Sequence, residues 1–276
     1  MDNTILLNIL ILGGTAFAAS FILYFVSKKF MVETDETTSK IVDVLPQANC
    51  GGCGKAGCAD FATACSKADA DSFANLYCPV GGHKVMQKIA SIKGFATVEK
   101  KPTMAVLLCQ GSCQNAPAKV VYDAVSSCRI ANRISSGPSG CPAGCLRLGD
   151  CIKVCRFGAL SINDETGLPT IDASKCVSCG ACAKVCPRGL FEIRPLSEAD
   201  SLVYVACRNK QKGAVARKNC KTACIGCMKC NKINDIIKVE NNLSYIPTNV
   251  DATKFGKELA DNCPTGAIVY RENIHG

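Results

Sequence analysis

The longest apolar stretch lies near the start of the chain, where residues 5–26 contain no charged side chain. A helix of this length covers the roughly 30 Å hydrocarbon core of a bilayer, so the pattern predicts a membrane-spanning anchor. Lys28 and Lys29 follow the stretch, whereas only Asp2 precedes it. The positive-inside rule then predicts a single-pass protein of the cytoplasmic (inner) membrane, with the bulk of the chain on the cytoplasmic side. The alternative, an uncleaved signal of a secreted disulfide protein, is disfavoured by this order of charges.

Beyond the anchor the apolar pattern predicts short elements of both kinds. Residues 59–67 and 84–92 have the spacing of helices, and residues 104–108 and 202–206 form apolar strands that each end at a cysteine. Residues 93–102 carry mixed charge and end in a proline, which indicates a linker. We therefore expect an α+β chain in four parts. The parts are residues 1–30, 31–95, 96–200 and 201–276.

Cysteine changes this picture most, because the 276 residues include 22 cysteines but only two histidines and no tryptophan. Aromatic residues make up 6% of the chain, so its small domains need disulfides or metal for cohesion. Cytoplasmic thiols stay reduced, which favours metal. His83 and His275 are too few for most histidine metal sites or acid–base mechanisms, and scarce acidic clusters disfavour two-metal phosphoryl chemistry.

The clearest motif is Cys176-x2-Cys179-x2-Cys182-x3-Cys186, followed by Pro187. This is the spacing of bacterial ferredoxins, in which three cysteines hold one four-iron cluster and the fourth ligates the neighbouring cluster. Zinc sites instead separate their Cys-x2-Cys pairs by a longer finger. The spacing therefore favours iron–sulfur clusters over zinc.

The partner motif is irregular: gaps of three, five and three residues separate its cysteines, and Arg156 replaces the usual proline. Residues 157–162 still match the turn and strand that follow a ferredoxin motif. The ferredoxin crossover rule predicts two four-iron clusters from the combined motifs. One cluster takes Cys141, Cys145, Cys151 and Cys186. The other takes Cys155, Cys176, Cys179 and Cys182.

A third set lies near the C-terminus, at Cys224-x2-Cys227-x2-Cys230. Asn234 stands where the fourth cysteine is expected, and the proline-flanked Cys263 is the predicted replacement. Cys220, which three residues separate from Cys224, is a competing ligand.

A fourth set lies near the N-terminus, at Cys50-x2-Cys53-x4-Cys58, in a glycine-rich loop whose backbone can curl round a cluster. Cys78 is favoured as its fourth ligand because a proline follows it. Cys65 lies on one face of the predicted helix, where a buried structural thiol is expected.

Some cysteines remain outside these four sets and suggest an internal repeat. The spacing of Cys141, Cys145 and Cys151 recurs later in the chain, and Cys109 and Cys207 end the two matching strands. The later copy is Cys220, Cys224 and Cys230. Two interpretations stay open: structural thiols, or a fifth cluster that draws on Cys109, Cys113, Cys128, Cys207 and Cys220.

Motifs for other chemistry are missing from the sequence. There is no G-x-G-x-x-G after a strand, no P-loop and no recognisable flavin attachment sequence. We therefore expect no substrate-converting site in this chain, and a function in passing single electrons between clusters.

The chain resembles the B subunit of the Rnf complex in its longer form, with extra C-terminal cysteines. The resemblance rests on the order anchor, N-terminal cysteine loop and ferredoxin motifs, and on two stretches of sequence. Residues 44–54 are VLPQANCGGCG, and residues 140–151 are GCPAGCLRLGDC. It implies a membrane anchor, a helical 4Fe-4S domain, a two-cluster ferredoxin-like domain and a further cluster module.

The resemblance also implies a function. The Rnf complex is an ion-translocating translocase that oxidises reduced ferredoxin, reduces NAD and pumps sodium ions or protons. Its B subunit carries electrons from ferredoxin towards partner subunits, which hold the flavin and NAD. The alternatives are a membrane-anchored ferredoxin-like subunit of another oxidoreductase and a zinc-stabilised binding module.

Basic residues give the chain a formal net charge of +9, and the densest run spans residues 208–221. Four clusters of net charge about −2 each would bring the loaded chain close to neutral. The run could offset the charge of the clusters or attract an acidic ferredoxin. Nucleic acid is not an expected partner, because aromatic residues are not interleaved with the basic ones.

Overall fold

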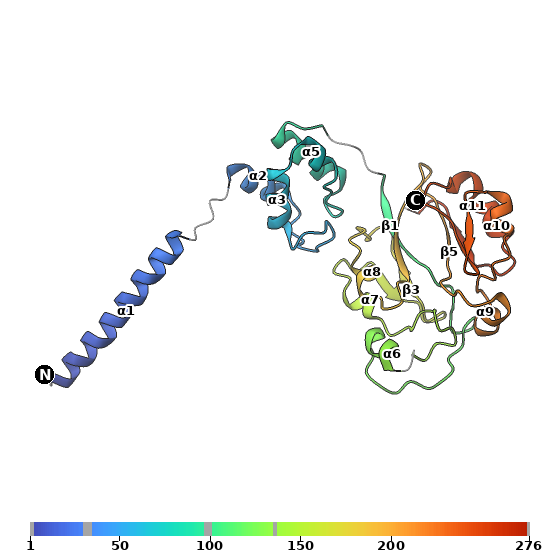
Figure 1. Ribbon diagram of the computed structural model, residues 1–276, viewed down its shortest axis with the longest axis horizontal. Coiled ribbons are helices and arrows are strands. Elements are labelled where there is room, and N and C mark those ends of the chain that lie inside the picture. Colours follow the sequence, from blue (N-terminus) through green and yellow to red (C-terminus); the bar gives the residue numbers. More distant parts are fainter. Residues whose placement is uncertain (1–2, 30–34, 97–100, 135–136, 275–276) are drawn as a thin grey trace.

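The computed structural model describes residues 3–29, 35–96, 101–134 and 137–274. Helix α1 (Asn3–Lys29) extends away from the rest of the chain (Figure 1). Its segment Leu10–Lys29 has a mean hydropathy of 1.9 and is long and apolar enough to cross a membrane. Apolar side chains such as Leu12 and Phe17 are exposed on it, as expected of a helix that contacts lipid.

Four short helices form a small domain after the anchor. Asp35 and Asp69 cap two of them, since their carboxylates accept hydrogen bonds from the backbone N–H groups of Thr37 and Ser72. Ile41, Phe61 and Ile89 are fully buried between the helices and form the centre of the core. The predicted helices correspond to α3 and α5. The helices are α2 (Glu36–Val44), α3 (Cys58–Lys67), α4 (Ala70–Ala74) and α5 (Gly82–Lys93).

Residues 103–195, the first unit, combine two antiparallel strand pairs with three short helices. The outer pair joins β1 (Thr103–Leu107) to β4 (Phe191–Pro195), and the inner hairpin joins β2 (Leu160–Ile162) to β3 (Pro169–Ile171). The helices are α6 (Cys128–Ile134), α7 (Asp150–Lys153) and α8 (Ala181–Val185).

Residues 202–271, the second unit, repeat this order of elements. Strand β5 (Leu202–Val205) pairs with β8 (Ile268–Arg271), and β6 (Lys238–Glu240) pairs with β7 (Leu243–Tyr245). The helices are α9 (Gly213–Asn219), α10 (Lys229–Ile233) and α11 (Ala252–Asp261). The shared order, outer strand, two helices, hairpin, helix and outer strand, matches the internal repeat predicted from cysteine spacing.

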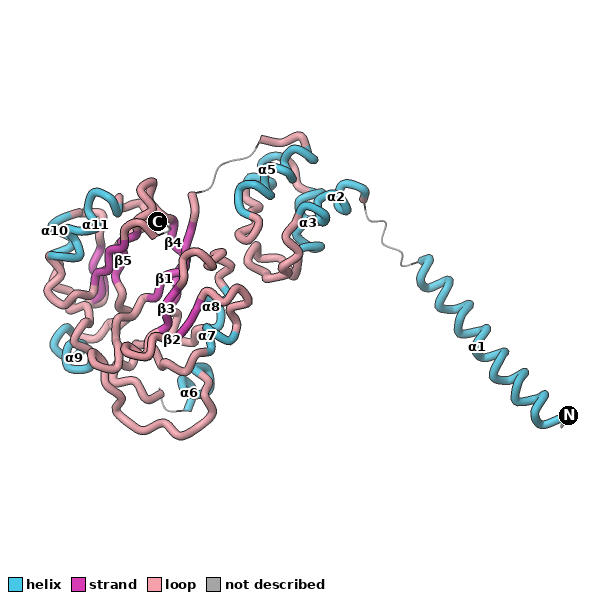
Figure 2. The backbone as a smooth tube through the Cα atoms, turned by 180° about the vertical axis from the view of Figure 1, so that it is seen from behind, coloured by secondary structure: helices cyan, strands magenta, loops and turns pink. Residues whose placement is uncertain are grey.

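The two units lie side by side (Figures 1 and 2) and share an apolar layer. Met104 and Val106 of β1 belong to the same buried cluster as Leu202 and Tyr204 of β5. Just beyond the strands, the Gln110 N–H donates to the Ala206 carbonyl at 3.2 Å. The ends of β1 and β5, and the cysteines that follow them, therefore converge.

The mixed helix-and-strand class predicted from the sequence is confirmed. The exact division into residues 1–30, 31–95, 96–200 and 201–276 stays a prediction. The first boundary and residues 97–100 of the predicted linker lie outside the described residues.

Candidate iron–sulfur sites

Sixteen of the 22 cysteines line four cavities, four to each cavity. All 22 thiols are free, so disulfides do not compete for them. The four cavities are similar in volume, about 20, 20, 10 and 20 Å³, which suits one kind of occupant. The four sets are Cys50, Cys53, Cys58 and Cys78; Cys128, Cys145, Cys151 and Cys186; Cys155, Cys176, Cys179 and Cys182; and Cys224, Cys227, Cys230 and Cys263.

The N-terminal cavity is formed by the glycine-rich loop and the segment before α5. The Gly52 N–H donates to Cys50 Sγ at 3.5 Å, and the Gly81 N–H donates to Cys78 Sγ at 3.4 Å. Such backbone donors stabilise thiolate ligands. Cys65, by contrast, is fully buried among the helices, and burial raises the pKa of its thiol to about 12. Cys65 therefore occupies the buried position that the sequence predicts for a structural thiol.

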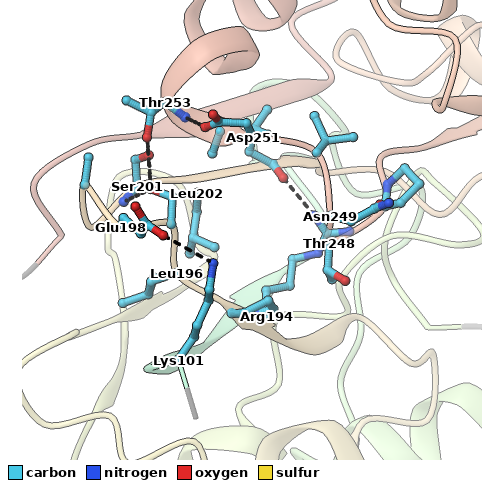
Figure 3. Close-up of a pocket in the computed structure, with 17 residues that line it drawn as sticks. Lys101, Arg194, Leu196, Glu198, Ser201, Leu202, Thr248, Asn249, Asp251 and Thr253 are labelled. Carbon is cyan, nitrogen blue, oxygen red and sulfur yellow. Dashed lines mark hydrogen bonds and ion pairs between the residues drawn. The ribbon is translucent and has the colours of Figure 1, made fainter. Parts of the chain in front are cut away.

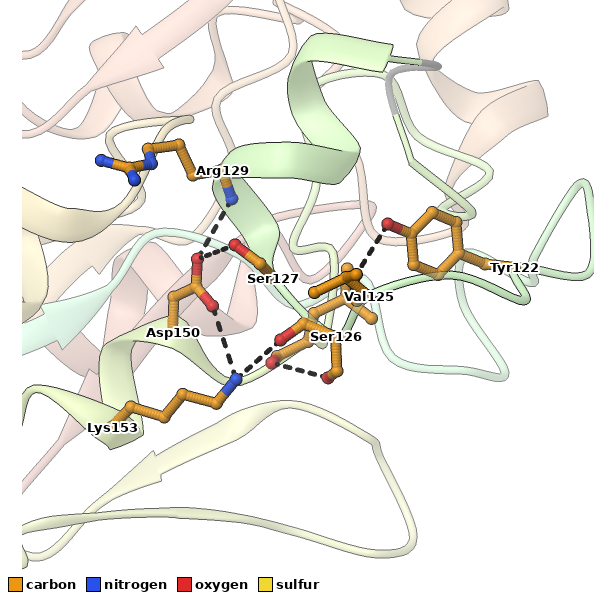
Figure 4. Close-up of polar contacts among 8 residues, drawn as sticks. Tyr122, Val125, Ser126, Ser127, Arg129, Asp150 and Lys153 are labelled. Atoms are coloured by element: carbon orange, nitrogen blue, oxygen red, sulfur yellow. Dashed lines mark hydrogen bonds and ion pairs between the residues drawn. The ribbon is translucent and has the colours of Figure 1, made fainter.

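One cavity of the first unit differs from the predicted set, because Cys128 lines it and Cys141 does not. The carboxylate of Asp150 explains the difference (Figure 4). Its Oδ2 accepts hydrogen bonds from Ser127 Oγ at 3.0 Å and from the Arg129 N–H at 3.1 Å, the residues on either side of Cys128. Asp150 itself begins α7, next to Cys151. This buried carboxylate therefore holds the start of α6 against the start of α7.

The other cavity of the first unit matches the prediction, with Cys155 from the upstream motif beside the three cysteines of the ferredoxin loop. The crossover is also present in the structure. Cys186, the last cysteine of the ferredoxin motif, lines the Cys128 cavity, and its Sγ accepts a hydrogen bond from the Leu190 N–H at 3.4 Å. The two cavities are thus formed by interleaved halves of both motifs.

The cavity of the second unit brings Cys263 to the three cysteines of its motif, as expected. Cys224 Sγ accepts a hydrogen bond from the Ser244 N–H at 3.5 Å, and the Ser244 hydroxyl lies 3.1 Å from Cys230 Sγ. Asn234, the counterpart of Cys155, instead accepts a hydrogen bond from the Ile236 N–H at 3.1 Å. The Asn234 side chain therefore stabilises a turn.

The five cysteines considered for a fifth cluster do not all come together. Cys113 is exposed and faces the β2–β3 turn, where an added Cβ on Gly167 would lie 2.7 Å from its sulfur. Cys128 belongs to the cavity described above. The remaining three, Cys109, Cys207 and Cys220, lie where the two units meet, together with Cys141.

Burial makes three of the cavity thiols less acidic. It raises the pKa of the Cys145 and Cys151 thiols to about 12, and that of the Cys182 thiol to about 11. At neutral pH these groups therefore hold their protons unless a cation displaces them, as metal binding does. Four converging thiols, backbone donors aimed at sulfur and a mostly apolar lining are what a [4Fe–4S] cluster requires. Such a group, when bound, accepts and releases one electron.

A larger cavity lies elsewhere. It has a volume of about 500 Å³ and is formed by the β4–β5 turn and residues 247–253 (Figure 3). Polar groups line it, among them Lys101 and Glu198, which are 4.0 Å apart, and Ser201, whose hydroxyl lies 3.3 Å from that of Thr253. None of the described residues around it is a cysteine. It is therefore separate from the sulfur chemistry.

The N-terminal cysteine loop touches the ferredoxin loop of the first unit. An added Cβ on Gly52 would lie 2.9 Å from Cys179 Cα, so only glycine permits this approach. Arg156 donates to the carbonyls of Ala48 and Asn49, at 3.3 Å each, and Lys184 Nζ donates to the Gly51 carbonyl at 3.3 Å. The loops that line these two cavities are far apart in the sequence but in contact in the structure.

Comparison with known proteins agrees with these sites. A family described as "4Fe-4S dicluster domain" matches residues 140–190, and one described as "Putative Fe-S cluster" matches residues 45–72. The chain is 37% identical to the B subunit of the ion-translocating oxidoreductase complex of Methanosarcina acetivorans, over 84% of this chain and 85% of the relative.

Two further relatives cover even more of the chain. The B subunit of the proton-translocating ferredoxin:NAD(+) oxidoreductase complex of Clostridium ljungdahlii is 36% identical, over 96% of this chain and 92% of the relative. The B subunit of the Na(+)-translocating ferredoxin:NAD(+) oxidoreductase complex of Acetobacterium woodii is 38% identical, over 97% and 78%.

Proposed function

Because the chain belongs to the B-subunit family of ion-translocating oxidoreductase complexes, we propose that it takes electrons from reduced ferredoxin and passes them to membrane-bound partner subunits. An iron–sulfur electron relay is the role this family and the dicluster domain support. The observation that carries the assignment is the set of four cavities, each lined by four free cysteines. We assign one [4Fe–4S] cluster to each cavity, with the sixteen cysteines that line them as ligands.

The N-terminal site is the proposed exit from the chain. Six residues separate α1 from α2, and a segment of that length spans at most about 21 Å. If α1 crosses the membrane, the N-terminal domain therefore stays close to the bilayer and to partner subunits within it. The contact between Gly52 and Cys179 supports transfer from the first unit to this domain.

The second unit is the part of the chain through which we propose that electrons enter. Cys227 and Met228 are exposed there, so the edge of its cavity is close to solvent. Exposed basic side chains of the same unit favour an acidic protein partner, since opposite charges accelerate encounter. They are Arg208, Lys210, Lys212, Arg217, Lys218, Lys221 and Lys229. Reduced ferredoxin is the partner we propose for this surface.

The proposed topology follows the order of charges round the anchor. Lys28 and Lys29 close α1, and the cysteine domains follow them. The positive-inside rule supports a single pass with these domains on the cytoplasmic side, where thiols stay reduced. The pumped ion differs between the two ferredoxin-dependent relatives and is not assigned to this chain.

Purification of the membrane complex through this chain tests the proposal. We expect a brown complex that oxidises reduced ferredoxin and contains flavin- and NAD-binding partners. Cys53→Ser should leave the complex assembled but abolish NAD reduction with ferredoxin, because the exit site lacks a ligand. A colourless chain that contains zinc, or a complex with no flavin- or NAD-binding partner, would contradict it.

A further inference from the structure

Four cysteines outside the cavities meet where the two units join, and each unit contributes an equivalent pair. Cys109 follows β1 and Cys207 follows β5. Cys141 stands four residues before the Cys145 motif, and Cys220 stands four residues before the Cys224 motif. The repeat therefore relates Cys109 to Cys207 and Cys141 to Cys220. We call this group the junction site.

The packing brings these thiols close together. An added Cβ on Gly111 would lie 3.4 Å from Cys109 Sγ and 3.6 Å from Cys220 Sγ, so both sulfurs border the same space. Cys141 and Cys220 are buried in one cluster with three alanines, against which Cys207 packs.

Hydrogen-bond donors point at the junction sulfurs as they do at the cavity cysteines. Cys109 Sγ accepts from the Gly111 N–H at 3.3 Å and from the Cys145 N–H at 3.4 Å. The side-chain amide of Asn209, which is 1% exposed, lies 3.6 Å from Cys141 Sγ and donates to it. A buried amide aimed at a sulfur stabilises a thiolate, whereas a neutral structural thiol gains little from it.

A half-buried cation also belongs to this region. Arg188 donates to the carbonyls of Cys141 (3.2 Å) and Gly144, and its Nε donates to Asn132 at 3.1 Å. Its guanidinium thus lies between the junction site and the Cys128 cavity, which it also lines. A fixed positive charge there offsets the negative charge that a four-thiolate cluster adds on either side.

We propose that Cys109, Cys141, Cys207 and Cys220 hold a fifth [4Fe–4S] cluster, which joins the relay of the second unit to that of the first. This inference rests on the proposed electron-relay function. It replaces the sequence-derived candidates Cys113 and Cys128 with Cys141. Four thiols give up their protons to ligate the iron.

The position of the junction site makes it a bridge. The Cys145 amide, which donates to Cys109, belongs to a ligand of the Cys128 cavity. On the other side, Cys207 packs against the core cluster that contains Cys224, and Cys224 lines the cavity of the second unit. One electron taken from the second unit therefore has a continuous route to the first, and the ultimate reductant is reduced ferredoxin.

Iron and acid-labile sulfide in the anaerobically purified full-length chain test the proposal. We expect about twenty irons in the wild-type chain and about sixteen in Cys109→Ala and in Cys207→Ala. Cys65→Ala and Cys113→Ala are matched controls, one buried and one exposed, and should keep about twenty. Sixteen irons in the wild type, or unchanged iron in both junction variants, would overturn the fifth cluster but leave the relay in place. A wild-type chain without iron would overturn both.

A second variant keeps the proposal testable if the alanine variants fail to fold. Asn209→Leu removes the donor to Cys141 and keeps all four junction cysteines. We expect unchanged iron and one reduction step, of five in a spectroscopic titration, moved to a lower potential. A titration in which the variant matches the wild type at every step would overturn the assignment of Cys141 as a ligand.

Discussion

The two units share one scaffold but hold different numbers of cavities. The first unit has two four-cysteine cavities, whereas residues 202–271, all of which the structure describes, form one. Two local differences account for this. Asn234 replaces Cys155, and helix α11 (Ala252–Asp261) occupies the place of the ferredoxin loop. The comparison shows that this fold can exchange a cysteine site for a packed helix.

The cores differ accordingly. Four of the ten buried members of the first unit's core are cysteines, against two of eleven in the second. Ile237, Ile246 and Leu259 are buried in the second unit at 0–1% exposure and supply apolar contact that the first unit lacks. We infer that the first unit depends on its clusters for stability, while the second depends more on hydrophobic burial.

Removal of iron should reveal the difference in stability between the two units most clearly. Structural metal contributes about 10 kcal/mol or more in small metal-dependent domains, so we expect β1 and β4 to lose over about 3 kcal/mol of exchange protection. Strands β5 and β8 should lose much less. Hydrogen exchange with mass spectrometry, before and after chelation with an oxidant, measures both. Equal loss in the two units would contradict the inferred difference.

Asp150→Ala should destabilise the first unit selectively. Ser127 Oγ and the Arg129 N–H lose their buried acceptor, so we expect unfolding to become easier by about 2–3 kcal/mol, with loss of about four irons as Cys128 moves away. Asp251→Ala is the matched control in the second unit, where the carboxylate caps α11. It should cost about 1 kcal/mol and no iron. Retention of all iron in Asp150→Ala would disprove the role of this carboxylate.

Gly256→Ala should destabilise the second unit without loss of a cluster. An added Cβ would collide with the ring of Tyr270, so α11 must move away from β8. We expect a loss of about 1–3 kcal/mol in chemical denaturation, with iron content unchanged. Lys257→Ala, at the exposed neighbouring position, should have an effect within about 0.5 kcal/mol. A tolerated Gly256→Ala would show that helix packing does not stabilise this unit.

The double variant Arg156→Ala and Lys184→Ala should have the smallest effect on stability. It removes hydrogen bonds between the N-terminal loop and the first unit, and exposed contacts of this kind contribute about 1 kcal/mol or less. Electron transfer to the N-terminal site should slow about tenfold, since the contact positions Gly52 against Cys179. Rapid-mixing spectroscopy of the reduced complex gives the rate. An unchanged rate would show that the two sites communicate by another route.

Regular motifs in the sequence predicted most of the cysteine groups. Only two residues separate Cys176 from Cys179 and Cys179 from Cys182, so this short spacing alone brings the three cysteines together. Proline-flanked Cys78 and Cys263 were also placed with the expected partners. Whether these groups ligate iron stays a prediction, as does the number of clusters.

The exchange of Cys141 for Cys128 could not be predicted from spacing. The Cys145–Cys151 gap contains Leu148 where the second unit has Cys227, so the motif lacks one ligand. A residue from α6 supplies it, through the tertiary contacts of Asp150. Alignment of the two repeats, with Leu148 opposite Cys227, was the signal that could have revealed the missing ligand.

An anaerobic reductive titration of the intact chain, with electrons counted against the bleaching of visible absorbance, tests the central claim most directly. A relay with one four-iron cluster in each cavity and one at the junction predicts a brown protein that takes up about five electrons per chain. A colourless, zinc-containing chain that takes up no electrons would contradict it.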